Sequence, residues 1–199
     1  MRRKLQIFIS STYPDLIEER HTAVEAILKA GHIPAGIEQF FKRPQAGIIK
    51  KWIDESDIFF LILGGLYGNM LPDGSKSHTH WAFDYAGEVG KPRFAFVLTD
   101  EALRQKPYDF VVLEDYPQYQ KFKQSVIETV PIYHIEDMRH IQMVIRDQLP
   151  ELARRDDLYG WVSGKDVQDA KKLLEDNTHL LKENAKLKAE LEEIKRANQ

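Results

Sequence analysis

Short apolar runs alternate along this chain with segments in which apolar residues recur every three or four positions. The runs are rich in β-branched and aromatic residues and predict strands at residues 5–9, 32–37, 57–63, 94–98 and 130–134. The periodic segments predict helices at residues 12–30, 48–55, 79–88, 116–126 and 138–152. Residues 99–115 fit neither pattern. Strands that alternate with helices form parallel sheets with right-handed crossovers, so we expect an α/β fold with a five-stranded, flavodoxin-like parallel sheet and flanking helices.

The first predicted helix carries a charged residue on its apolar face. Thr12 is suited to cap this helix, and Pro14 is suited to its first turn. The apolar stripe of the helix includes Arg20. A buried arginine needs a partner, and we expect Asp57 or Glu38 to supply it.

The last part of the chain has a different composition. Residues 160–164 carry a glycine at each end, and neither glycine nor proline occurs from residue 166 onward. Leucines and asparagines there alternate in steps of three and four, which predicts a heptad seam with Asn177 and Asn184 at a positions. We therefore expect a domain at residues 1–160, a linker at 161–165 and a coiled-coil helix at 166–199 that makes homo-oligomers through residues 166–197.

Two leucines beside the seam affect how many helices such a coiled coil would contain. The asparagines at a positions favour a parallel dimer. Leu174 and Leu181 lie at e positions and widen the apolar seam. That leaves a trimer, a tetramer, docking onto the globular domain and a solvated single helix as alternatives.

Composition narrows the classes of function. The net charge is -3, which gives no overall electrostatic footprint for nucleic acid. No cysteine occurs, so a disulfide framework and thiolate chemistry are excluded, in keeping with the cytoplasm. The apolar start of the chain is short and reads as a strand, and no apolar run approaches the ~20 residues of a membrane helix. We expect a cytoplasmic protein without a membrane or nucleic-acid partner.

Two segments carry candidate chemistry at the ends of predicted strands. The first contains Ser10, Ser11, Thr12 and Tyr13, whose hydroxyls and following helix amides suit a phosphate or a ribose. An ordinary strand-to-helix turn is the alternative, because the segment has no glycine-rich phosphate fingerprint.

The second segment follows the most apolar strand. Gly64 and Gly65 allow a ligand or another backbone to approach closely, and Tyr67 can stack on a base or bond a ribose. A tight loop with a packed tyrosine is the alternative. His78 and His80 are two residues apart, but no carboxylate or cysteine cluster supports a metal site, so we expect solvated loop histidines and no metal.

Taken together, these segments resemble a TIR-like domain family of unknown function. The opening match is Phe8-Ile9-Ser10-Ser11-Thr12-Tyr13-x-Asp15-Leu16-x-x-Glu19-Arg20. It continues through Gly31-His32-Ile33-Pro34, Trp52-Ile53-x-x-Ser56-Asp57, Gly64-Gly65-x-Tyr67-Gly68, Ser77-x-Thr79, Asp84-Tyr85-Ala86 and Gly90-Lys91-Pro92. The family is similar to TIR domains and nucleoside deoxyribosyltransferases, and it heads multidomain signalling ATPases and bacterial defence proteins.

The resemblance implies N-glycosidic chemistry on a nucleotide, with NAD⁺ as the substrate. In such sites a glutamate on the helix after the third strand stabilises the developing oxocarbenium charge. The family pattern is Ser-x-Thr-x-x-Glu-Tyr-x-Tyr-Ala, and Ala82 stands at the glutamate position here. By the same resemblance Asp84 and Tyr85 belong to the catalytic group, and Ser77 and Trp81 belong to the nucleotide site.

Alanine at position 82 has two explanations. The chain is either a natural pseudoenzyme, or the glutamate was exchanged for alanine to trap a bound substrate. We favour the exchange because the residues around Ala82 match the family pattern.

The resemblance leads to an expectation and two rivals. We expect an NAD⁺ glycohydrolase or cyclase of antiviral defence or signalling, inactive through Ala82 and working with other defence or signalling proteins. A nucleoside deoxyribosyltransferase or nucleotide N-glycosidase is one rival. The other is a nucleotide-sensing or assembly adaptor without catalysis.

Overall fold

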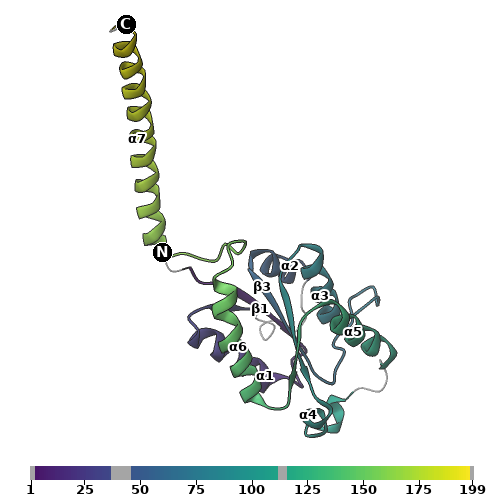
Figure 1. Ribbon diagram of the computed structural model, residues 1–199. Coiled ribbons are helices and arrows are strands. Elements are labelled where there is room, and N and C mark those ends of the chain that lie inside the picture. Colours follow the sequence, from purple (N-terminus) through teal and green to yellow (C-terminus); the bar gives the residue numbers. More distant parts are fainter. Residues whose placement is uncertain (1–2, 37–45, 112–115, 198–199) are drawn as a thin grey trace. The chain divides into compact units, whose positions relative to one another are not determined.

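A computed structural model describes residues 3–36, 46–111 and 116–197 of the chain (Figure 1). It contains a parallel sheet of five strands in the order β2-β1-β3-β4-β5. The strands are β1 (Gln6–Ser11), β2 (Ile33–Ala35), β3 (Ile58–Leu63), β4 (Arg93–Leu98) and β5 (Ile132–Ile135). This confirms the predicted flavodoxin-like sheet.

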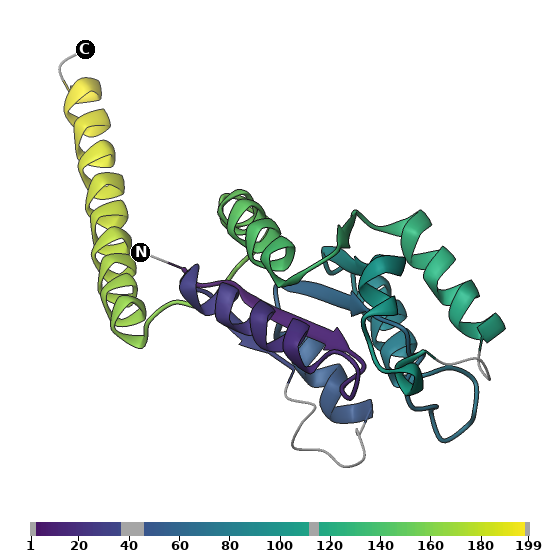
Figure 2. The ribbon, with the colours of Figure 1, turned by 90° about the horizontal axis from the view of Figure 1, so that it is seen from below.

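Alternate residues of the buried strands point to opposite faces, and each face has its own apolar layer. Helices α1 (Ile17–Lys29) and α6 (Met138–Ala153) cover one face, where Ile58, Phe60 and Ile62 of β3 belong to the core. Helices α2 (Ala46–Glu55), α3 (His78–Glu88) and α5 (Tyr116–Thr129) cover the other face (Figures 1 and 2). Central strands buried on both faces explain the continuous apolar run of β3.

The first helix begins later than its sequence predicts. It starts at Ile17, its N-cap is Leu16, and no side chain caps it. The predicted capping role of Thr12 is therefore wrong. The amide of Leu16 instead donates to the carbonyl of Tyr13, so a turn separates β1 from the helix.

The segment that fitted neither pattern contains two short elements. Helix α4 (Asp100–Arg104) is capped by Thr99, whose hydroxyl accepts from the amide of Ala102. The 3₁₀-helix η2 (Tyr108–Phe110) follows. Both lie after β4, on the edge of the sheet where β1 and β3 also end.

The beginning and the end of the globular unit are fastened together. Lys4 and Trp161 exchange two backbone hydrogen bonds of 2.7 Å. The carboxylate of Asp57, just before β3, accepts from the amide of Gln6 at 2.8 Å and from that of Gly160 at 2.9 Å. Residues 4–161 form one compact unit, and a second unit begins at Val162.

The second unit contains the helix α7 (Gly164–Ala197), which begins inside the segment predicted as a linker. None of the helices in the described ranges is long and apolar enough to cross a membrane.

Candidate functional site

The site residues predicted from the first strand lie at the carboxyl end of β1. Ser10, Ser11 and Thr12 are buried there, whereas Tyr13 is partly exposed. The hydroxyls of Ser10 and Thr12 are enclosed without a hydrogen-bond partner in the described part of the chain. Ser11 accepts from the guanidinium of Arg20 at 3.3 Å. Two of the four side chains therefore retain unused hydrogen-bonding capacity.

Arg20 is buried, as its position on the apolar stripe predicted, and it joins two strand ends. It donates to the carbonyl of Ile9 at 2.9 Å and also to the carbonyl of Gly36 after β2. Asp57, one of the two partners we expected, is bonded to backbone amides instead. Glu38, the other, lies outside the described residues. The guanidinium therefore holds the ends of β1 and β2 together.

A short hairpin carries the chain from β3 to α3. Met70 and Ser77 form an isolated antiparallel bridge, and the amide of His78 donates to the carbonyl of Asn69 at 2.9 Å. Ser77 is the N-cap of α3, and its hydroxyl accepts from the amide of His80 at 3.2 Å. The hairpin thus places the first turn of α3 beside the loop that follows β3.

At Gly68 the loop after β3 meets Thr12, which is distant in sequence, and the start of α3. A Cβ atom on this glycine would lie 3.0 Å from Cγ2 of Thr12, 3.4 Å from the hydroxyl oxygen of Thr79 and 3.9 Å from Cβ of Ser77. Its φ of +93° lies in the left-handed region, which favours glycine. The structure therefore places Thr12 and Ser77 beside Gly68, in the loop that also contains Gly64, Gly65 and Tyr67.

Ala82 lies on the buried face of α3, in the apolar layer. It is 2% exposed and follows Thr79 by three positions. Residues three or four apart on a helix are neighbours on one face, so a longer side chain at position 82 would lie beside His78 and Thr79. The alanine leaves this place without a carboxylate.

His80 connects three polar groups along one side of α3. Its Nδ1 is 2.8 Å from the hydroxyl of the buried Tyr67, and its Nε2 is 3.3 Å from the carboxylate of Asp84. The same carboxylate accepts from Lys76 at 2.6 Å. The ring of His80 stacks on Phe122 of α5. The two histidines predicted to be solvated therefore lie in the first turn of α3 and are partly buried.

Burial also affects the charge of these histidines. Desolvation lowers the pKa of His80, against the opposing effect of Asp84, and Lys76 lowers it further. Desolvation lowers the pKa of His78 too, and its Nδ1 has no partner in the described ranges. Both imidazoles are therefore held neutral near pH 7.

Trp81 and Tyr85 occupy a third side of α3, toward α2. Their rings stack with centroids 5.7 Å apart, and the hydroxyl of Tyr85 donates to Asp54 at 2.5 Å. This hydrogen bond raises the pKa of Tyr85 to about 12. Asp84 and Tyr85, predicted to act together with position 82, thus point to two different sides of the helix. No contact here tests their predicted catalytic roles.

Protein atoms fill the space beside the two glycines after β3. A Cβ atom on Gly64 would lie 2.7 Å from the carboxylate of Asp15, and one on Gly65 would lie 2.2 Å from the carbonyl oxygen of Phe110. The hydroxyl of Tyr119 donates to the carbonyl of Gly64 at 2.5 Å. The close approach predicted for these glycines is therefore made by other parts of the chain.

Two buried carboxylates, Asp15 and Glu19, were not among the predicted site residues. Asp15 has no well-formed hydrogen bond to another described group. Burial raises its pKa, whereas the Thr12 hydroxyl, the amide of Leu66 and the charge of Lys106 lower it. Glu19 forms a 2.6 Å ion pair with Lys106. Glu19 and Lys106 are far apart in the sequence, so no local pattern predicts their contact. Only the family motif, which contains Asp15 and Glu19, pointed to these two carboxylates.

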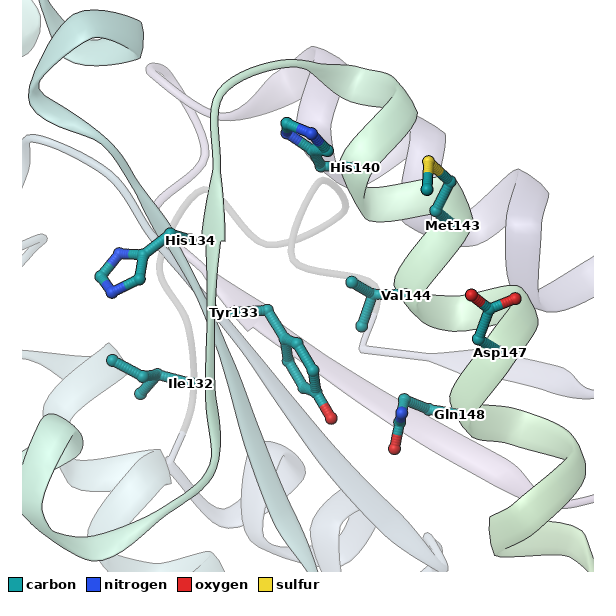
Figure 3. A pocket seen from close by; sticks show the side chains of 8 residues that line it. All are labelled: Ile132, Tyr133, His134, His140, Met143, Val144, Asp147 and Gln148. Carbon is teal, nitrogen blue, oxygen red and sulfur yellow. The ribbon is translucent and has the colours of Figure 1, made fainter.

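A cavity of about 370 Å³ lies elsewhere, between β5 and α6 (Figure 3). Tyr133 points toward α6 there, and His134 points to the other side of the strand. No predicted site residue lines this cavity. The described residues contain no group of three or more side chains suited to hold a metal ion.

A known protein family matches most of this chain by sequence. The family profile described as "Domain of unknown function (DUF4062)" matches residues 6–150. The chain belongs to this family. The DUF4062 match covers the sheet, helices α1 to α5 and most of α6, and it ends before α7. None of the curated proteins matches the chain by sequence.

Solved structures resemble the DUF4062 domain in fold. The TIR domains of the activated Roq1 resistosome that directly recognises the pathogen effector XopQ superpose with a TM-score of 0.50 at 13% identity, covering 73% of this chain and 99% of theirs. The CMP N-glycosidase BcmB of Clostridium botulinum gives 0.39 at 14% identity, covering 73% and 98%. The Flv1 flavodiiron core of Synechocystis sp. PCC6803 gives 0.40 at 14%, covering 76% and 37%. The TIR-like fold rests on the first of these.

Proposed function

We propose that the globular unit is a TIR-like nucleotide-binding domain whose ligand is NAD⁺, and that it lacks the carboxylate needed to cleave the N-glycosidic bond. The observation that carries this proposal is the meeting of Thr12, Ser77 and Thr79 at Gly68, where the Thr12 hydroxyl makes no well-formed hydrogen bond in the described chain and lies near the carboxyl of Asp15. Hydroxyls beside the first turn of a helix suit phosphate and ribose oxygens. The TIR-like fold supports this placement of the site.

The proposal assigns the missing chemistry to position 82. Departure of nicotinamide leaves positive charge on the ribose, and a nearby carboxylate stabilises that charge. Ala82 cannot do so. Asp84, the nearest carboxylate along α3, is paired with Lys76 and His80 on another side of the helix. We therefore expect binding of NAD⁺ with little or no turnover.

The inner wall of this site is closed. Ser77 is 0% exposed, and Thr12 and Thr79 are buried as well. A nucleotide reaches these hydroxyls only when the loop after β3 moves away from Thr12 and Thr79. Loop movements of this kind accompany binding in many enzymes.

A non-catalytic adaptor is the second candidate, and the apolar surroundings of Ala82 favour it. The side chain packs in the same layer as Phe8, Phe59 and Leu61. A glutamate there would have to direct its carboxylate out of this layer, toward Thr79. If the surroundings are adapted to alanine, restoring the glutamate will not restore activity.

Binding is tested by isothermal titration calorimetry of the full chain with NAD⁺, with ADP-ribose and CMP for comparison. Thr12→Val removes the hydroxyl and keeps the shape, so loss of its hydrogen bond should weaken NAD⁺ binding about tenfold. Thr22→Val on α1 is the matched control and should leave affinity unchanged. Absence of NAD⁺ binding would reject NAD⁺ as the ligand.

Cleavage is tested with Ala82→Glu, and Ala82→Gln provides a neutral side chain of equal size. The glutamate variant should release nicotinamide from NAD⁺ ~100-fold or more faster than the other two forms. Equal rates in folded proteins would remove this role from position 82 and favour the adaptor. Deoxyribosyl exchange without NAD⁺ turnover would instead identify a nucleoside deoxyribosyltransferase.

A further inference from the structure

The helix α7 carries an apolar seam that is open to solvent. Its 34 residues would span ~50 Å at the rise of an α-helix. Leu173, Leu180, Leu187 and Leu191 are each more than half exposed. They are spaced by seven, seven and four residues, which places them on one stripe of the helix. Such a stripe indicates a helix that buries its leucines against a partner.

Polar residues interrupt this stripe at regular places. With the first three leucines at d positions, Asn177 and Asn184 fall at a positions and Leu191 at the next a position. In a parallel, in-register pair each asparagine meets its own copy and can hydrogen-bond to it. In an antiparallel pair a residues meet d residues, so each asparagine would face a leucine and lose its partner. The asparagines therefore favour the parallel arrangement.

Charged side chains beside the stripe favour the same arrangement. In this register Glu183 occupies a g position and Lys188 the following e position, and both are exposed. In a parallel dimer a g residue lies beside the e residue five positions later on the partner, so Glu183 meets Lys188 twice across the two-fold axis. In an antiparallel dimer g residues meet g residues, and like charges would face one another. The charge pattern thus selects both orientation and register.

We propose that α7 pairs with α7 of a second copy of this chain as a parallel, in-register two-stranded coiled coil. The leucines form its core, the paired asparagines fix its register, and the Glu183–Lys188 contacts flank it. Only Val162 and Ser163 separate the globular unit from α7. The two globular units are consequently attached at the same end of the coiled coil. Pairing of α7 requires no nucleotide in the globular unit.

Charge reversal tests the pairing in the full chain. By sedimentation equilibrium the unaltered chain should be a dimer. Glu183→Lys and Lys188→Glu each place two like-charged pairs in the homodimer, so each should raise its dissociation constant about tenfold. An equal mixture of the two variants restores opposite charges at both contacts and should form a heterodimer as tight as the original. A monomeric original chain, or variants that dimerise unchanged, would overturn the proposal.

Orientation is tested with single cysteines, because the chain contains none. Leu173→Cys lies near one end of the stripe, where only a parallel pair brings the two sulfur atoms within disulfide distance. Mild oxidation should link most chains. Lys172→Cys, on the outer surface of the helix, is the matched control and should remain largely unlinked. Equal linkage of both variants, no linkage at position 173, or a trimer or tetramer in the ultracentrifuge would refute the parallel dimer.

Discussion

The hydroxyl of Tyr67 lies 2.8 Å from Nδ1 of His80, and this contact joins the loop after β3 to the first turn of α3. Asp84 and Lys76 extend the contact to the protein surface. Because Tyr67 is buried and His80 stacks on Phe122, the pair holds the loop against α3 and α5. His80 therefore helps to hold the loop that contributes to the proposed nucleotide site.

Removing this hydrogen bond should destabilise the domain moderately. Tyr67→Phe and His80→Phe preserve ring packing, and each should lower the free energy of unfolding by ~1 kcal/mol. Urea denaturation of the single and double variants should give a coupling energy of ~0.5–1.5 kcal/mol. Tyr133→Phe, whose hydroxyl makes no hydrogen bond with another described residue, is the control. Fully additive effects would show that the pair contributes nothing beyond its separate packing.

Stability should fall on mild acidification. His78 and His80 have lowered pKa values in the folded protein because burial disfavours their charged forms. The unfolded chain therefore binds more protons below its histidine pKa of ~6.5, and the free energy of unfolding should decrease as pH drops below that value. Thermal melts between pH 7.5 and 5 would show this. His80→Gln should flatten the profile, and the exposed His21→Gln should not.

Asp15 should have the opposite dependence. Its raised pKa means that the folded state holds the carboxyl proton more readily than the unfolded state does. Stability from this group is therefore present at low pH and is lost as pH rises through the folded-state pKa. Asp15→Asn removes the buried charge, so it should raise the melting temperature at pH 7 by ~2–4 °C. Exposed Asp156→Asn is the comparison, and a lower melting temperature for Asp15→Asn would show that the carboxylate is stabilising.

Two glycine substitutions should change stability in opposite directions. Gly65→Ala would place Cβ 2.2 Å from a backbone oxygen that cannot swing aside, so it should cost ~1–3 kcal/mol or more. Gly47 lies within α2, and no other described atom comes within 4 Å of the place its Cβ would take, so Gly47→Ala should stabilise by ~0.5–1 kcal/mol because alanine is the better helix former. Guanidinium unfolding measures both. Equal tolerance at the two positions would contradict the contact between Gly65 and Phe110.

The strands and the long helices were predictable because their signal is local. The continuous apolar run that ends at Leu63 predicts a strand without reference to the rest of the chain. The periodic apolar stripes of α6 and α7 predict helices in the same way. The start of α1 was misplaced because Thr12 had a suitable side chain for a cap. In the structure Thr12 and Asp15 are buried in the edge of the sheet, so a turn precedes the helix. Tertiary burial outweighed a local preference there.

The candidate site was predictable only in part. Strand ends of a parallel sheet meet at one edge, and this rule predicts that Thr12 and the glycine loop lie close together. Ser77 was assigned to the same site only through the family resemblance. The contacts of Lys106 with Glu19 and of Tyr119 with Gly64 join segments many residues apart. No short-range pattern signals such pairs. The filling of the space beside Gly64 and Gly65 by other protein atoms depends on these distant contacts.

Because Lys4 pairs with Trp161, the first and last residues of the globular unit lie side by side. Asp57 reinforces this pairing from the start of β3, because its two oxygens bind the amides of Gln6 and Gly160. Parts of a larger protein joined ahead of Lys4 and beyond Trp161 would share one anchor on the amino side of the sheet, whereas Thr12 and Ser77 lie at its carboxyl edge. Tension applied through α7 would consequently act first on this anchor, which lies at the opposite edge of the sheet from Thr12 and Ser77.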